Sequence, residues 1–573
     1  MKRTTIVALL ALALPAGAFQ EALSPEAPDT TRPLVWDETA AEHLLNRAGF
    51  GARPLEIRAA VRMGHEAFVD SLFAEPREHS DPYYARNYAP GSVRAKRMED
   101  MESVKQRRRT TRAQDRNQLS DFGAWWVERM LSGEDPLREK MTLFWHGHFT
   151  SSMDDVKNSY EMIVQNRFLH DNALGSFEDL VKGIARDPAM LEYLDNDSNV
   201  AQHPNENFAR ELMELFTLGE GNYTEEDVKE AARAFTGWSD GGGKFRFRAR
   251  KHDDGEKTVL GRTGAWDGDD VIDILLEQDV CAEYMAGRII GWFEGLEPEP
   301  ARRDEYAAFL RENEYAIGRF LRRLFLDPDF YRDEVVGTRI AGPVELMVGT
   351  SRRLGIQAPP QLVVIGSRIL GQRLFHPPNV KGWEEGAAWI TTSTLMQRGN
   401  FAGLLVGEVS LDDILEVDVS AVASDESDME VSSGMMEDDA MDPVAAGELR
   451  RLRAAGGLAR PTDARKPPKR KVGSLGSLKR IKGYDWSPRL NLTARLDRLG
   501  ARNDGKIVNT LLDELLGVEP APGTRAYLVD FVKTERQALG IRNGKLLSRP
   551  SESEPLLRRM AHLILSLPEA QLN

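Results

Sequence analysis

The sequence predicts a mainly α-helical protein: a large multi-helix single core with at most a small β-hairpin, plus a disordered insertion before the C-terminal helices. Three observations carry this prediction. Apolar residues recur at helical spacing from about Asp37 to Leu405 and again after Tyr484. Alternating patterns typical of strands are scarce. Hydrophobic residues make up 41% and charged residues 29% of the 573 residues, the balance of a globular protein with a sizeable core.

The first residues have the pattern of an export signal. Lys2 and Arg3 precede a short apolar run at residues 6–14, and residues 16–18 (AGA) match the small residues that a signal peptidase accepts. The run is too short to span a bilayer. We therefore expect residues 1–18 to be a signal peptide and the mature protein to be periplasmic or extracellular, without stable membrane insertion.

Helix start signals recur in the main part of the chain. Ser176 and Thr224 are each followed three residues later by Asp179 and Asp227, respectively. This is the spacing of a capping box. Behind Thr224, five apolar residues fall on one helical face: Val228, Ala231, Ala232, Phe235 and Trp238. The clearest strand pattern, residues 244–248, is expected to form a small hairpin with residues 258–260.

The composition changes late in the chain. Residues 412–442 are rich in Asp, Glu, Ser and Met without one Lys or Arg, and residues 465–471 are strongly basic. Such a pair of blocks is typical of a disordered, self-associating linker. The predicted organisation after the signal peptide has four parts: a flexible segment (19–36), a main helical domain (37–405), a disordered acidic-then-basic insertion (406–484) and a C-terminal helical segment that packs on the main domain (485–573).

Charge and cysteine content argue against two broad classes, although the basic residues 465–471 leave binding of nucleic acid or another anionic polymer open. The formal net charge of −15 argues against a nucleic-acid partner, because a phosphate-binding surface needs clustered cations. Cys281 is the only cysteine, so no intramolecular disulfide can form. Its apolar helical surroundings predict that it is buried.

Residues 144–149 (FWHGHF) are the first cluster with chemical potential. His146 and His148 cannot share one face of a helix, so they can converge on a metal only from a loop or a strand-like turn at Gly147. The alternative is that two buried histidines bond to backbone or carboxylate groups. We take both histidines as candidate catalytic residues.

The second cluster spans residues 195–206. Asp195, Asp197, Asn199 and Glu206 occupy positions one, three, five and twelve of a calcium-loop spacing, which suggests calcium or another divalent cation. Val200 stands where that loop needs glycine for its sharp turn. The favoured interpretation is therefore a polar turn that caps the following helix, with a cation site as the minority alternative.

The helix after this cluster has a polar side. Glu206, Arg210 and Glu214 are spaced four residues apart and predict an ion-pair ladder. If another helix covers this side, the buried carboxylates need partners. We therefore expect His146 and His148 to meet this face in one polar pocket, and we include Glu206 and Arg210 among the candidate catalytic residues.

A third cluster surrounds His376, which we include as a candidate catalytic residue. Residues 374–383 (LFHPPNVKGW) combine two prolines with a glycine and project Asn379, Lys381 and Trp383. Both a structural loop over the core and a ligand-facing loop explain this pattern.

The chain resembles the large bacterial family called domain of unknown function 1800. The resemblance rests on five motifs: residues 46–51 (NRAGFG), 144–149, 165–166 (QN), 205–219 (NENFARELMELFTLG) and 378–383 (PNVKGW). It runs from about His43 to Phe401 and resumes at residues 566–571. It implies export, a helical fold and association with a second exported protein that resembles alkaline phosphatases and sulfatases. It implies no reaction and no catalytic residues.

Two functions stay open from the sequence. The first is a binding or assembly module that works with another exported protein. The second is a metal-assisted or acid–base enzyme, hydrolase-like, with a pocket of His, Glu and Arg. No nucleophile elbow, phosphate-binding glycine loop, zinc-protease helix or haem-attachment motif is present in the sequence, which favours the module.

Overall fold

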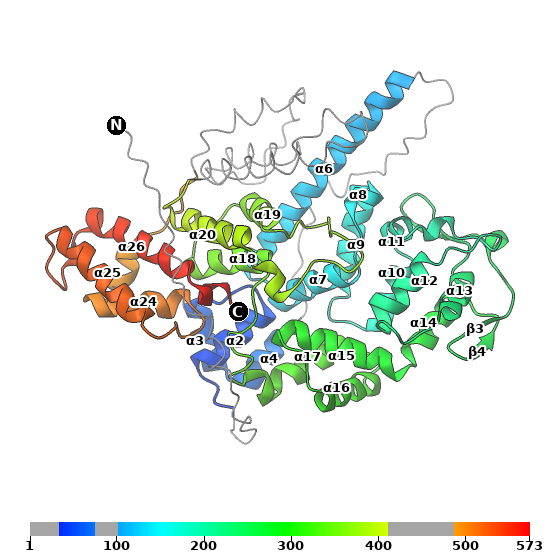
Figure 1. Cartoon of the computed structure of the whole chain (residues 1–573), viewed down its shortest axis with the longest axis horizontal. Helices are drawn as coiled ribbons and strands as arrows, with labels where there is room; N and C mark the ends of the chain where they lie inside the picture. Colours follow the sequence, from blue (N-terminus) through cyan, green and yellow to red (C-terminus); the bar gives the residue numbers. More distant parts are fainter. Residues whose placement is uncertain (1–33, 75–100, 411–485, 573) are drawn as a thin grey trace. The chain divides into compact units, whose positions relative to one another are not determined.

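Helices account for most of the chain that a computed structural model describes, namely residues 34–74, 101–410 and 486–572 (Figure 1). The mainly α-helical prediction is therefore confirmed. The predicted signal peptide (1–18), residues 19–33 of the predicted flexible segment and nearly all of the predicted insertion (406–484) lie outside the described residues.

The first half of the described chain contains these elements: α2 (Glu38–Ala48), α3 (Pro54–Met63), α4 (His65–Ser71), α6 (Met101–Ser132), α7 (Pro136–His148), α8 (Met153–Val156), α9 (Ser159–Asp171), α10 (Phe177–Ala185), α11 (Pro188–Tyr193), the 3-10 helix η1 (Asn196–Ser198), α12 (Asn207–Glu211), the π-helix η2 (Leu212–Thr217), α13 (Glu225–Ala234), β1 (Trp238–Asp240), β2 (Phe245–Phe247), the 3-10 helix η3 (Ala249–Lys251), β3 (Lys257–Val259) and β4 (Arg262–Gly264).

The second half contains α14 (Gly268–Leu276), α15 (Asp279–Glu294), α16 (Pro300–Glu312), α17 (Ile317–Leu326), α18 (Pro343–Leu354), α19 (Pro360–Ile369), α20 (Thr392–Val406), α23 (Leu492–Arg498), α24 (Asp504–Leu515), α25 (Thr524–Ala538) and α26 (Pro550–Leu565), with 3-10 helices η4 (Pro328–Tyr331), η5 (Gly386–Trp389), η8 (Leu546–Ser548) and η9 (Pro568–Gln571).

Both predicted helix starts are confirmed, but the reciprocal capping box forms only at Thr224 and not at Ser176. The Ser176 hydroxyl accepts a hydrogen bond from the Glu178 N–H at 3.2 Å and begins α10. At the start of α13, Thr224 accepts from the Asp227 N–H at 3.2 Å, and the Asp227 carboxylate accepts from the Thr224 N–H at 2.9 Å. This reciprocal pair satisfies two backbone donors that a helix end leaves without partners.

The predicted strand pairing is wrong. Residues 245–247 of β2 pair antiparallel with β1, and β3 pairs with β4, so the described residues form two small hairpins. A tight turn explains the outcome: Asp240 accepts hydrogen bonds from the N–H groups of Gly242 and Gly243, and both glycines have positive φ. Trp238 consequently lies in β1 and not on the helical face behind Thr224.

Buried apolar side chains gather in two clusters that share α7. One cluster comes mainly from α6, α18, α19, α20 and the C-terminal helices α23 to α26. The other comes mainly from α2, α7 and α10 to α17, and it includes the fully buried Cys281, as predicted. On α7, Leu143 belongs to the first cluster, whereas Phe144 and Trp145 belong to the second. A cavity lined by Leu143 of the first cluster and by Phe144 and Trp292 of the second lies where the two clusters meet.

The C-terminal helices contact the rest of the described chain directly. Helix α26 packs against α20, and the backbone of Leu572 forms an isolated antiparallel bridge with Ile340. Arg398 on α20 donates to the side chain of Gln571 and to the carbonyl oxygen of Ala341. The last residues of the chain thereby hold the segment that leads into α18.

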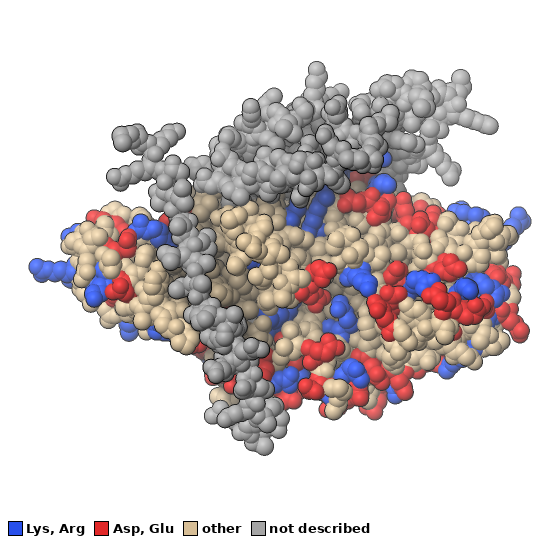
Figure 2. Space-filling model, in the orientation of Figure 1, with Lys and Arg blue, Asp and Glu red and all other residues tan. Residues whose placement is uncertain are grey.

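The surface in Figure 2 intermixes charges of both signs over the helical region at the right of the view. Such mixed surfaces are typical of solvated faces. Within the described residues, no helix is both long enough and apolar enough to cross a bilayer.

Candidate functional site

His146 and His148 both lie inside α7, not in the turn that a shared metal would require. The Nε2 atom of His146 accepts a hydrogen bond from the Phe375 N–H at 3.0 Å. The Nε2 atom of His148 donates to the carbonyl oxygen of Phe216 at 3.1 Å. Burial lowers the pKa of each histidine to about 3, so both imidazoles are neutral. Their contacts orient backbone rather than bind carboxylates.

The expected ladder of Glu206, Arg210 and Glu214 does not form. Arg210 donates two hydrogen bonds, at 2.6 and 2.7 Å, to Glu225 at the start of α13. Glu214 accepts instead from the hydroxyl of Tyr223 at 2.8 Å. The change from α-helix to π-helix after Glu211 shifts Glu214 away from the four-residue spacing with Arg210, because bonding there runs from i to i+5.

The predicted meeting of histidines and carboxylates is therefore not what the structure shows. Among the described residues, neither His146 nor His148 has a hydrogen bond or ion pair with Glu206 or Glu214. Each imidazole has one partner on the backbone of another segment, and the Nδ1 atom of His146 is buried without a hydrogen-bond partner among the described residues. These residues do not form one acid–base site.

The calcium-like spacing folds into a hydrogen-bonded turn. Asn199 is buried, and its amide donates to the Asn196 side chain and to the Ala232 carbonyl oxygen, while its oxygen accepts from the Asn205 N–H at 3.0 Å. Asn205 in turn accepts from the Asn207 N–H at the start of α12.

A cation has no preformed ligand set in this turn. Asp195 takes a left-handed conformation, and burial together with the Asp195 and Asp240 charges raises the pKa of Asp197. Across the described parts of the chain, no group of three or more His, Cys, Asp or Glu side chains is placed to hold a metal ion.

Of the other candidate residues, His376 lies near His146 alone, which accepts a hydrogen bond from the backbone of the neighbouring Phe375. Its Nδ1 atom is 3.0 Å from a carboxylate oxygen of Asp154, and this contact lowers the pKa of Asp154. It lines a small cavity of about 50 Å³ together with Arg116, Arg368 and Arg373.

The loop of the third cluster docks on the end of α7. The Thr150 hydroxyl donates to the carbonyl oxygen of Val380 at 2.7 Å. Gly382 has a φ of 85°, and a Cβ atom there would lie 2.4 Å from the carbonyl oxygen of Gly147. Only glycine fits this close approach. The contact places Trp383 over Gly147.

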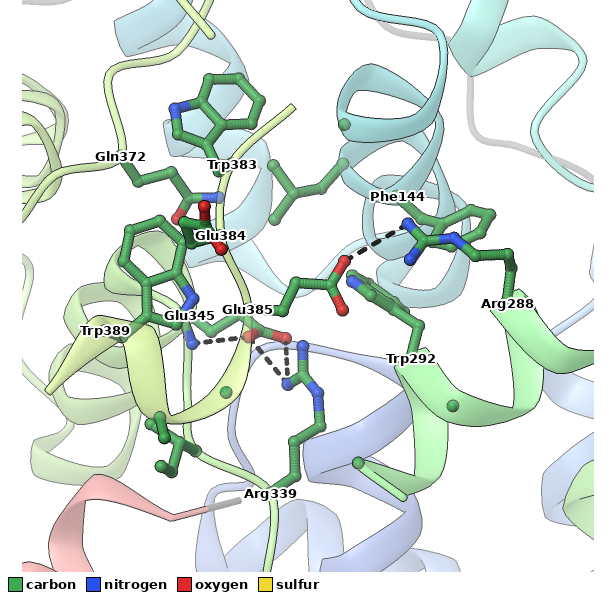
Figure 3. A pocket seen from close by; sticks show the side chains of 18 of the residues that line it. Phe144, Arg288, Trp292, Arg339, Glu345, Gln372, Trp383, Glu384, Glu385 and Trp389 are labelled. Carbon is green, nitrogen blue, oxygen red and sulfur yellow. Dashed lines mark hydrogen bonds and ion pairs between the residues drawn. The ribbon is translucent and has the colours of Figure 1, made fainter. Parts of the chain in front are cut away.

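Trp383 is one wall of a cavity of about 370 Å³, which we call the tryptophan pocket. Trp383 and Trp389 come from the loop before α20, Phe144 from α7 and Trp292 from α15. Figure 3 shows Trp383, Trp389 and Gln372 on one side of the space, and Phe144, Trp292 and Arg288 on the other. A concave, largely preformed site with aromatic walls is the usual form of a small-molecule site.

The floor of the tryptophan pocket is a buried charge cluster of Lys140, Arg339 and Glu345, which we call the charged floor. One Arg339 nitrogen donates to both oxygens of Glu345 at 2.9 and 2.8 Å, and Lys140 forms an ion pair with the same carboxylate. The Gly342 N–H donates to Glu345 at 2.9 Å. Burial opposes ionisation of Glu345, but the two cations hold its pKa far below the usual range. Burial lowers the pKa of Lys140 to about 8, although the negative charge of Glu345 acts to raise it.

Aromatic rings also hold the charged floor in place. Lys140 lies over the rings of Phe50 and Trp292, at 5.1 and 5.2 Å from their centroids. Arg339 lies 5.0 Å from the centroid of Trp292. Cation–π contacts of this length are favourable when they are removed from solvent. Both cations are therefore fixed by a carboxylate and by a ring.

The mouth of the tryptophan pocket is polar. Glu384 and Glu385 lie in the loop before η5, and Glu385 is 3.5 Å from Arg288 of α15. Both partners are partly exposed, so this ion pair is weak. The lining contains no Ser, Cys or His. The arrangement is suited to holding a polar organic molecule, and the lining also includes the hydroxyl of Thr338 and the carboxylates of Glu384 and Glu385.

The sequence analysis missed most residues of this pocket. None of His146, His148, Glu206, Arg210 and His376 lines it. A signal was available: Lys140 stands in the apolar helical pattern of α7, and Glu345 follows directly after Pro343 and Val344. A charged residue at a core position needs a partner, and that requirement marks a site.

Comparison with known proteins gives a family but no activity. No curated protein and no solved structure matches the chain. One family model does match, over residues 43–572, which is nearly the whole chain and includes all the elements that form the tryptophan pocket. The chain therefore belongs to the family described as "Protein of unknown function (DUF1800)".

Proposed function

We propose that this protein is a binding module whose tryptophan pocket holds a small organic molecule. The observation that carries this proposal is the cavity of about 370 Å³ with aromatic walls above a rigid charged floor. Its volume lies in the range of about 300–1,000 Å³ that is usual for small-molecule sites. The separate hydrogen bonds of His146 and His148 weigh against the alternative of an enzyme whose site combines these histidines with Glu206 and Arg210.

Two glycines of α15 allow a matched test. Gly291 lines the pocket, and a Cβ atom there would meet only the Leu296 carbonyl oxygen, at the ordinary contact distance of 3.6 Å. A leucine at this position would therefore fill the pocket without a clash at Cβ. Gly287, one turn earlier, does not line the pocket, and a Cβ atom there would be 3.8 Å from the Arg303 side chain. Gly287→Ala is the control.

The experiment is a thermal-shift screen of the full chain with sugars, sugar acids and phosphates, aromatic acids, amino acids and amines. We expect at least one compound to raise the Tm of the wild type and of Gly287→Ala, but not of Gly291→Leu. A ligand present at 100 times its Kd stabilises the folded state by about 2.7 kcal/mol. A screen in which no compound acts, or in which every active compound acts equally on Gly291→Leu, contradicts the proposal.

We also infer that the module works after export with a second exported protein, one that resembles alkaline phosphatases and sulfatases. The export pattern of residues 1–18 and the family resemblance support this inference. Fractionation of the producing cell should place the tagged protein outside the cytoplasm, and affinity purification under crosslinking should recover such a partner. A cytoplasmic location would contradict export, and recovery without that partner would contradict the association.

A further inference from the structure

The region beneath the tryptophan pocket carries more buried cations than carboxylates. Besides Lys140 and Arg339, the buried guanidinium groups of Arg47 and Arg398 also interact electrostatically with Glu345. Another buried carboxylate near Arg47, Glu294, is already held by Arg302 at 2.6 Å and by Arg332 at 3.4 Å. Glu345 therefore lies among four cations, one of which, Arg47, also interacts with Glu294, and an anion bound at Arg339 would offset part of this positive charge.

Arg339 is the member of this group that reaches the pocket. One of its terminal nitrogens is committed to Glu345. Its other two nitrogens form no hydrogen bond to any described residue, although its side chain is only 11% exposed. Gln372, which also lines the pocket, uses its oxygen to accept from the Val344 N–H at 3.0 Å, and its amide nitrogen has no hydrogen-bond partner within the described chain. These donors are available to a carboxylate or phosphate bound in the pocket.

The walls restrict the rest of the ligand. Trp383 and Trp389 lie across the space from Trp292 (Figure 3). The ring of Trp292 already makes a cation–π contact with Arg339. The indole N–H groups of these three tryptophans have no acceptor among the described residues. Aromatic faces favour the weakly positive C–H groups of a saturated ring, whereas indole donors and the carboxylates of the mouth favour hydroxyl groups. A pyranose ring offers both.

We propose that the tryptophan pocket binds a pyranose that carries an anionic group, either a sugar acid or a sugar phosphate, with the anion at Arg339 and Gln372 and the ring beside Trp389. This inference rests on the proposed binding function and names its ligand class. Carboxylate and phosphate share the chemistry that Arg339 recognises, namely planar or tetrahedral oxygens that accept two parallel hydrogen bonds.

Calorimetric titration with four probes tests this ligand class: glucuronate, glucose 6-phosphate, glucose and benzoate. We expect glucuronate, glucose 6-phosphate or both to bind the wild type and Gly287→Ala with the same Kd. Glucose and benzoate should bind at least tenfold more weakly, because each lacks one of the two features. Gly291→Leu should bind none of them.

Gln372→Glu is the charge test. It keeps the oxygen that accepts from Val344 but adds a negative charge where the ligand's anion would lie, so the anionic sugar should bind at least tenfold more weakly. An unchanged Kd in this variant, with its Tm preserved, would show that the anion lies elsewhere.

The other outcomes separate this inference from the proposed function. Glucose or benzoate binding as tightly as the anionic sugars would contradict the ligand class and leave the pocket as a binding site. The same holds if none of the four probes binds while another compound of the screen acts on the wild type but not on Gly291→Leu. If no compound distinguishes Gly291→Leu from the wild type, the proposed function itself is wrong.

Discussion

Glu345 shows how strongly a buried charge depends on its immediate partners. Its carboxylate is 4% exposed and is held by Arg339, Lys140 and the Gly342 N–H. Removing one partner of such a cluster leaves an opposite charge buried without compensation, which costs more than the intact pair contributes. The charged floor is therefore a point where a single substitution affects both the fold and the pocket.

We predict that Glu345→Gln lowers the free energy of unfolding by about 3–5 kcal/mol, because it leaves Lys140 and Arg339 without their carboxylate. Lys140→Met should cost less, since Arg339 still pairs with Glu345. Urea denaturation measures both. Arg210→Gln, which breaks a surface pair, is the control and should leave the midpoint unchanged. A Glu345→Gln midpoint equal to that of the wild type would contradict this account of the floor.

The raised pKa of Glu161 predicts that the stability of the protein depends on pH. Burial, with the charges of Asp240, Glu192 and Asp187, raises its pKa from the ordinary 4.5 to about 8. The folded state then binds more protons than the unfolded state between these pH values, so stability falls as pH rises through that window. Glu161→Gln should be more stable than the wild type at pH 8 and should show a shallower decline from pH 4.5 to 8. Parallel stability–pH curves for the two proteins would refute the role of Glu161.

At the residue scale, local patterns predicted some short-range partners correctly and others wrongly: the capping box of Thr224 forms, whereas the ladder of Glu206, Arg210 and Glu214 does not. Thr224 and Asp227 are three residues apart, and their capping box was predicted. Lys140 and Glu345 are 205 residues apart, so no local pattern could pair them. His146 and His148 were recognised as inward-facing, but their backbone partners, Phe375 and Phe216, are also distant in sequence.

The loop that carries Trp383 is positioned by one glycine. We predict that Gly382→Ala destabilises the protein clearly more than Gly386→Ala. Both glycines have positive φ, but an added Cβ atom clashes with the Gly147 carbonyl oxygen only at Gly382. Gly386→Ala is the control, and it should lower the free energy of unfolding by about 1–2 kcal/mol from backbone strain alone. Urea midpoints compare the two variants, and equal losses would show that the approach to Gly147 does not hold the loop.

At the element scale, helix positions were predictable and strand partners were not. Helical periodicity spans many residues, so the mainly α-helical class followed from it. The strands are three residues each, too short for a pattern to choose between partners. The change to a π-helix at Leu212–Thr217 was also not predicted from the sequence, and it alters the expected spacing between Arg210 and Glu214.

At the scale of the whole molecule, the pocket exists because α7 joins two hydrophobic clusters. The first cluster includes residues on both sides of the predicted insertion, among them Phe401 and Leu404 before it, and Leu556 and Met560 after it. Burial of apolar surface between these parts should hold them together without a covalent link.

We predict that a chain cut at a protease site placed between residues 442 and 465 stays associated, because α20 and α26 share the first cluster. The two fragments should elute as one species in size-exclusion chromatography under native conditions and separate in urea. Arg398→Ala, which removes the contacts to Gln571 and Ala341, should weaken the association. Fragments that separate without denaturant would contradict the packing described here.

The most direct test of the central claim is a crystal structure of the protein with the compound that raises its Tm most. The account predicts density for that compound inside the tryptophan pocket, between Trp389 and Trp292, with its polar group at Arg339. Density for the compound at another place on the protein, with the tryptophan pocket empty, would contradict the account.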